Sequence, residues 1–100
     1  MVSRRQRADW QQRAEEVEVL CADRNLKLWE KTHRVASVYK GVDLDGLKSK
    51  HRRRLFDDLA RVNAILGQYP IETFDDYRLI VDHDLRNIIE IFRGFSRFAP

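Results

Sequence analysis

The chain has 100 residues, of which 35% are charged and 43% hydrophobic, and its net charge is +3. This length fits one domain, and the low content of glycine (4) and proline (2) argues against an all-β fold with many turns. The single cysteine excludes an intramolecular disulfide, and no apolar run approaches the ~18 residues of a membrane span. No apolar stretch follows the charged N-terminus, so we expect no secretory signal and a cytoplasmic location.

Charge is distributed unevenly along the chain. Residues 1–54 contain 14 Lys or Arg and 8 Asp or Glu, a net charge of +6, whereas residues 55–100 contain 5 and 8, a net charge of −3. This asymmetry permits either an anionic partner at one end of the molecule or head-to-tail self-association.

Residues 4–39 predict a long amphipathic helix, because they contain no glycine or proline and their apolar residues recur at steps of three, four and seven. Ser3 is a candidate N-cap, although the basic first turn opposes the helix dipole. The alternative is two helices broken near residues 22–25, with Asp23 or Asn25 capping the second. We expect the long helix, bent at that point. Its apolar stripe consists of Trp10, Ala14, Val17, Cys21, Leu28, Val35 and Val38.

Residues 45–66 predict a second helix. Gly41 is a natural stop for the first helix, and Asp43 and Asp45 in the connection are both able to cap the second. Gly67 follows the last residue of the periodic pattern and predicts its end.

Residues 74–93 predict a third helix, which is the most apolar of the three and the expected centre of the core. Residues 73–76 (Thr-Phe-Asp-Asp) form a variant capping box, and Gly94 predicts the C-terminal stop. Two aromatic residues in the tail either fold back onto the core or contact a partner. The predicted inward residues are Phe74, Tyr77, Ile80, Val81, Leu85, Ile88, Ile91 and Phe92.

These segments together predict an all-α fold, a small bundle with a long N-terminal helix. The bundle has three helices, or four if the first segment is broken, and residues 1–100 form a single helical domain.

The first segment gives the strongest sequence evidence for a protein–protein surface. Trp29 is offset by one residue from the apolar stripe, so the apolar surface is wider than one stripe, and aromatic residues are favoured in interface cores. A long first helix would also extend past the other two and expose its N-terminal half. Ordinary core packing is the alternative. The candidate interface residues are Trp10, Ala14, Val17, Leu20, Cys21 and Trp29.

Residues 48–54 are the strongest charge feature, because five of the seven are Lys or Arg. Such a cluster attracts nucleic acid or an acidic protein through Coulomb forces and counterion release. On a helix it covers almost two turns, so the patch is diffuse, and it contains no interleaved aromatic residues. A solvated face that pairs with Asp57 and Asp58 is the alternative. The candidate anion-binding residues are Lys48, Lys50, Arg52, Arg53 and Arg54, and a second basic group is Arg4, Arg5, Arg7 and Arg13.

Residues 83–87 (His-Asp-Leu-Arg-Asn) resemble the phosphoacceptor H-box of sensor histidine kinases, in which a histidine followed by an acidic residue lies on a helix. The resemblance implies His83 as phosphoacceptor and Asp84 as its acidic neighbour. It covers five residues, and the sequence departs from the pattern at Ile88, where a proline is common. Only 17 residues follow His83, and no Gly-rich ATP-binding domain is present. Two helix-surface residues are the alternative.

No cofactor or metal signature is present, since His33 and His51 lie in different segments without metal-ligand spacing. We therefore expect a non-enzymatic protein without cofactor, metal or membrane contact. The predicted function is a small protein–protein interaction module (an adaptor, inhibitor or regulatory subunit) that docks on another protein or on a second copy of itself. The second hypothesis is a nucleic-acid-binding regulator that uses residues 48–54. The third is histidine phosphotransfer at His83.

Overall fold

The computed structural model describes residues 3–100, and all regular secondary structure in that range is helical, which confirms the predicted all-α fold. No helix in this range combines the length and apolarity needed to cross a bilayer. The elements in chain order are α1 (Arg4–Ala22), α2 (Leu28–Val38), α3 (Ser49–Leu66), the 3₁₀ helix η1 (Phe74–Leu79), α4 (Asp82–Arg93) and the 3₁₀ helix η2 (Gly94–Phe98).

The first predicted helix is broken, so the expectation of one helix over residues 4–39 is wrong. Ser3 caps α1 as predicted, because its side chain accepts a hydrogen bond of 3.1 Å from the Gln6 amide. The helix ends at Ala22, where the Asp23 carboxylate accepts from the Asn25 amide at 2.8 Å. Such local side-chain bonds compete with helical ones. Neither residue caps α2, whose N-cap is Lys27.

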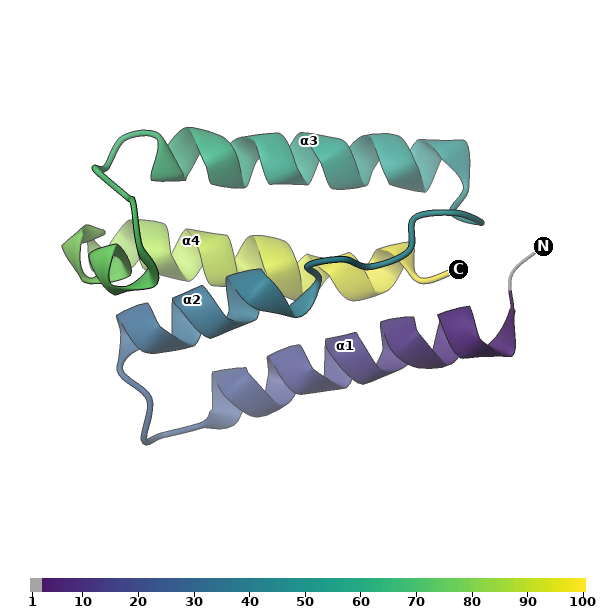
Figure 1. Cartoon of the computed structure of the whole chain (residues 1–100), viewed down its shortest axis with the longest axis horizontal. Helices are drawn as coiled ribbons and strands as arrows, with labels where there is room; N and C mark the ends of the chain where they lie inside the picture. Colours follow the sequence, from purple (N-terminus) through teal and green to yellow (C-terminus); the bar gives the residue numbers. More distant parts are fainter. Residues whose placement is uncertain (1–2) are drawn as a thin grey trace.

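The break turns α1 and α2 into an antiparallel hairpin (Figure 1). Each helix supplies a cation to the C-terminal carbonyls of the other. Lys31 of α2 donates to the Cys21 carbonyl at 2.9 Å, and Arg13 of α1 donates to the Val38 and Lys40 carbonyls at 2.6 and 3.0 Å. A cation at a helix C-terminus also complements the helix dipole. Arg13 therefore belongs to the hairpin and not to the second basic group.

The other two predicted helices form with altered starts. The second begins at Ser49, not at residue 45, because residues 39–48 form an irregular connection with positive φ angles at Gly41 (76°) and Gly46 (87°). The third is divided. The predicted capping box exists, with Asp76 accepting from the Thr73 amide at 2.8 Å, but it starts η1, and the chain is extended at Ile80 before α4 begins. Backbone hydrogen bonds to Asp76 lower the pKa of its carboxyl.

The core is centred on α4, as predicted. α4 contacts α1, α2 and α3, whereas α3 lies at the edge of the bundle and, within the described chain, contacts only α4 and η2 (Figure 1). Ile88 is completely buried, and the tail folds back, so that Phe95 and Phe98 are 1% and 0% exposed. Of the predicted inward residues, Phe74 and Val81 are instead 56% exposed, because the division into η1 and α4 interrupts the single helical stripe that the sequence predicted.

Candidate functional site

The candidate interface residues of the first segment lie mostly in the core. Trp10 and Val17 are each 1% exposed, while Ala14, Leu20, Cys21 and Trp29 are half-buried. The Trp10 ring lies 5.5 Å from the Tyr39 ring, and its indole N–H donates to the Asp43 carbonyl at 3.4 Å. The expectation that the N-terminal half of this segment lacks an intramolecular neighbour is therefore wrong, because the hairpin brings α2 and residues 39–48 onto it.

The candidate anion-binding residues are all exposed on the first two turns of α3. Within residues 3–100, none of the five has a carboxylate at ion-pair distance. The expected pairing with Asp58 is absent because that buried carboxylate accepts instead from Arg97 at 2.8 Å and from Arg61 at 3.4 Å. Arg52 alone makes an intramolecular contact, to the Leu44 carbonyl at 2.9 Å. Cations at a helix N-terminus oppose the dipole, so their contribution to folding is unfavourable.

Phe56 is an exposed apolar residue beside the basic residues at the start of α3. It is 51% exposed, an unusual position for a large aromatic side chain on a folded helix. Arg52 and Arg53 precede it by four and three residues, so both are its neighbours on the helix surface. Leu59, one turn further on, continues the same side of α3 toward an apolar cavity.

The second basic group lies at the same end of the bundle. α1 and α3 run in the same direction, so their first turns are both found there, beside the C-terminus (Figure 1). The Gln6 side chain of α1 donates to the carbonyl of Asp45, three residues before Lys48. The fold therefore places Arg4, Arg5 and Arg7 at the same end of the bundle as the α3 cluster, although α1 and α3 do not contact each other.

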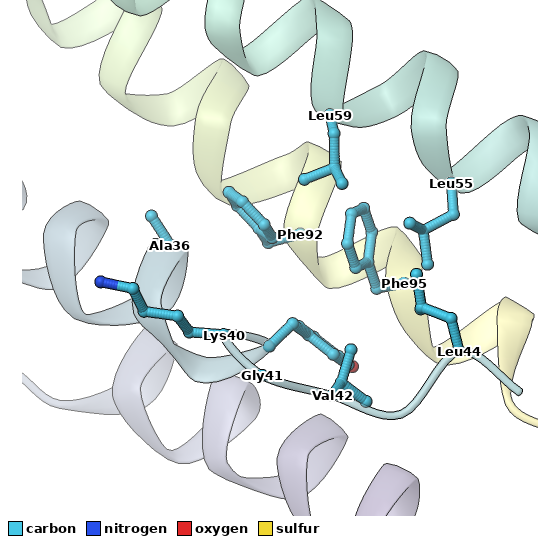
Figure 2. Close-up of a pocket in the computed structure, with 10 residues that line it drawn as sticks. Ala36, Lys40, Gly41, Val42, Leu44, Leu55, Leu59, Phe92 and Phe95 are labelled. Carbon is cyan, nitrogen blue, oxygen red and sulfur yellow. The ribbon is translucent and has the colours of Figure 1, made fainter.

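An apolar cavity of about 350 Å³ lies between α2, α3 and the α4–η2 segment, beneath residues 39–44. It exists because α2 and α3 do not contact each other, and the connection between them covers only part of the gap. In Figure 2, Leu55 and Leu59 extend from α3 toward Phe92 and Phe95, and Ala36 lies across from them on α2. The remaining lining residues are Tyr39, Lys40, Gly41, Val42 and Leu44.

The pKa values of Tyr39, Tyr69 and His33 are shifted from those of the free side chains. Burial raises the pKa of Tyr39, which lines the cavity, to about 12. The Tyr69 hydroxyl donates to the Asp84 carboxylate, which raises the pKa of that phenol. Burial lowers the pKa of His33, whose Nε2 is sealed from solvent without a hydrogen-bond partner. Its ring lies 3.9 Å from that of Phe74 and 5.5 Å from that of Tyr77.

The structure separates the two residues of the H-box resemblance. His83 is exposed and lies 3.4 Å from the Asn87 amide, whereas Asp84 is half-buried and bound to Tyr69. The Asp84 carboxylate thus fixes the chain between α3 and α4. No group of three or more His, Cys, Asp or Glu side chains in residues 3–100 is arranged to hold a metal ion.

No protein-family model matches the sequence, and no curated protein or solved structure matches it significantly.

Sequence reasoning missed Phe56 and the cavity. Phe56 carried a usable signal, because it falls outside the helical apolar pattern that the other large apolar residues of this segment form, which are Leu55, Leu59, Val62, Ile65 and Leu66. The cavity carried none, since it depends on the spacing of helices that are distant in sequence.

Proposed function

We propose that the chain is a small non-enzymatic protein–protein interaction module that docks on an acidic surface of another protein through α3. The observation that carries this proposal is a row of unpaired cations beside an exposed aromatic side chain. We define the α3 docking face as Lys48, Lys50, Arg52, Arg53, Arg54 and Phe56.

The composition of this face supports a protein partner. Arginine and phenylalanine are enriched at protein–protein interfaces, and lone surface charges contribute little affinity, so an apolar anchor is needed beside them. The cations supply steering and orientation toward an acidic partner. Residues 55–100 carry a net charge of −3, which disfavours a long polyanion lying across the whole molecule.

The test is a quantitative pull-down from the native host with three baits: the wild type, the variant Lys50→Ala/Arg53→Ala/Arg54→Ala, and Phe56→Ala. Arg52 is left in place because it contacts Leu44. The matched control is Arg24→Ala/Arg78→Ala/Arg86→Ala, three exposed arginines elsewhere on the surface. We expect an acidic protein to be retained by the wild type and the control and lost from both α3 variants. Identical retention by all four baits would contradict the proposal.

The second candidate function is nucleic-acid binding, and the observation that favours it is the position of two basic groups at the same end of the bundle. Binding would then depend on Arg4, Arg5 and Arg7 as well as on α3, and it would weaken steeply as salt rises because counterions are released. Phe56→Ala would have little effect on phosphate contacts. A gel-shift titration at low salt tests this directly, and an absence of binding to single- and double-stranded DNA and RNA would exclude it.

A further inference from the structure

The apolar cavity beneath residues 39–44 is not needed for docking through α3, and its lining has the composition of a small-molecule site. Its volume, about 350 Å³, lies within the range of roughly 300–1,000 Å³ that is typical of ligand pockets. It corresponds to about a dozen water molecules at liquid density. Leu55, Phe92 and Phe95 are buried and form the floor, while Ala36 and Leu59 are half-exposed and lie at the mouth.

The few polar groups around this cavity select the charge of a ligand. No Asp or Glu is among the ten lining residues. Lys40 is the one charged side chain among the ten lining residues, and its ammonium lies 5.9 Å from the Phe74 ring, directed away from Phe92 and Phe95 (Figure 2). A change of its rotamer would bring the ammonium over the mouth. On the α3 side, the Arg52 guanidinium contacts the carbonyl of Leu44, which is itself a lining residue. The nearby Asp43 faces a different hollow, shared with Arg5 and Asp9 of α1.

Tyr39 adds an oriented polar group. Its ring is held between Trp10 and Phe95, at centroid distances of 5.5 and 5.1 Å. Its hydroxyl makes no hydrogen bond within residues 3–100. The hydroxyl oxygen is also not fully buried, because His33 Nε2 is the one fully buried polar side-chain atom without a partner in that range. It is therefore available to donate a hydrogen bond, since a tyrosine hydroxyl is protonated at neutral pH.

We propose that this cavity binds a free single-chain aliphatic carboxylate, with the tail against Leu59, Phe92 and Phe95 and the headgroup at the mouth beside Lys40, the one charged lining residue. An apolar tail displaces water from a surface that water hydrates poorly. A carboxylate at the mouth stays partly solvated while it pairs with the Lys40 ammonium, so it avoids the desolvation cost of full burial.

The test is isothermal titration calorimetry of the full chain with decanoate. We expect saturable binding at one site. Decyltrimethylammonium, which has the opposite charge and a tail one carbon longer, should bind about tenfold more weakly, and butyrate, which has only a short propyl tail, should not bind measurably. Equal binding of decanoate and decyltrimethylammonium would show unselective adsorption and overturn the proposal, as would an absence of decanoate binding.

Two pairs of variants locate the site. Ala36→Phe fills the mouth and should abolish decanoate binding, whereas Ala64→Phe on the exposed side of α3 should leave it unchanged. Lys40→Glu should weaken binding about tenfold, and the exposed Lys27→Glu should not. Because Ala36→Phe could disturb folding, nuclear Overhauser contacts between decanoate methylenes and the Phe92 and Phe95 rings of the wild type provide a second measurement. Contacts to other aromatic rings only would overturn the assignment.

Discussion

α3 and α4 are antiparallel neighbours that use their side chains differently. α4 buries five of its 12 residues, whereas α3 buries only three of its 18. The shorter helix is surrounded by α1, α2 and α3, and the longer one is covered on one side only. Most of the α3 surface therefore makes no contribution to the core, and within the described chain no side-chain hydrogen bond or ion pair accounts for Lys50, Arg53 and Arg54, nor does burial account for Phe56.

The largest expected loss of stability comes from a substitution in α1, and it tests whether the core around α4 includes Trp10. Trp10→Ala should lower the free energy of unfolding by roughly 3–5 kcal/mol, since it removes a fully buried indole. Val19→Ala, on the 69% exposed side of the same helix, is the control and should change it by about 0.5 kcal/mol or less. Urea denaturation measures both. Similar small effects for the two variants would place Trp10 outside the core.

A matched pair compares the two helices directly. Ile88→Ala in α4 should cost roughly 2–5 kcal/mol of unfolding free energy, the usual cost of truncating a buried aliphatic side chain. Phe56→Ala in α3 should cost about 0.5 kcal/mol or less, although it removes more atoms. Thermal and urea unfolding followed by circular dichroism provide the values. A loss at Phe56 as large as that at Ile88 would remove the distinction between the helices.

A smaller effect involves pH and the junction of α2 with η1. The His33 ring packs against Phe74 in a tilted arrangement and against the edge of Tyr77, with Arg34, Lys40 and Asp75 as its charged neighbours. Its pKa is lowered in the folded state, so the unfolded chain binds more protons as the pH falls below about 6.5. Its contribution to stability is therefore fully present above that pH and is lost as the pH falls toward the folded-state pKa.

The variant His33→Phe removes this titration. Between about pH 7.5 and 5.5, the unfolding free energy of the wild type should fall more steeply than that of the variant. Denaturant titrations at several pH values measure the difference. Parallel pH profiles for the two proteins would mean that His33 has the same pKa in the folded and unfolded chains.

The sequence predicted those features that depend on local chemistry. The Ser3 cap, the Thr73–Asp76 capping box and the helical periodicity of residues 49–66 and 82–93 are properties of neighbouring residues. The break at residues 23–27 was harder to predict, because no glycine or proline marks it and the apolar stripe continues across it. The stripe continues because both helices of the hairpin face the same core.

The candidate site divides in the same way. The sequence composition of the basic cluster was enough to predict that it is exposed. Its lack of acidic partners could not be predicted in this way, because the tertiary fold directs Asp58 toward Arg97. The position of the α1 and α3 basic groups at the same end of the bundle, and the cavity below residues 39–44, depend on the full arrangement of the helices.

In this account, α4 forms the core, whereas the exposed cations of α3 do not stabilise the fold. The most direct test is the unfolding free energy of Lys50→Ala/Arg53→Ala/Arg54→Ala, measured by urea titration at low salt. Because these cations have no intramolecular partner in the described chain and oppose the dipole of α3, the stability should stay within about 0.5 kcal/mol of the wild type or rise slightly. The far-ultraviolet spectrum should be unchanged. A loss of more than about 1 kcal/mol would contradict the account, because it would show that the cluster stabilises the fold and need not be reserved for a partner.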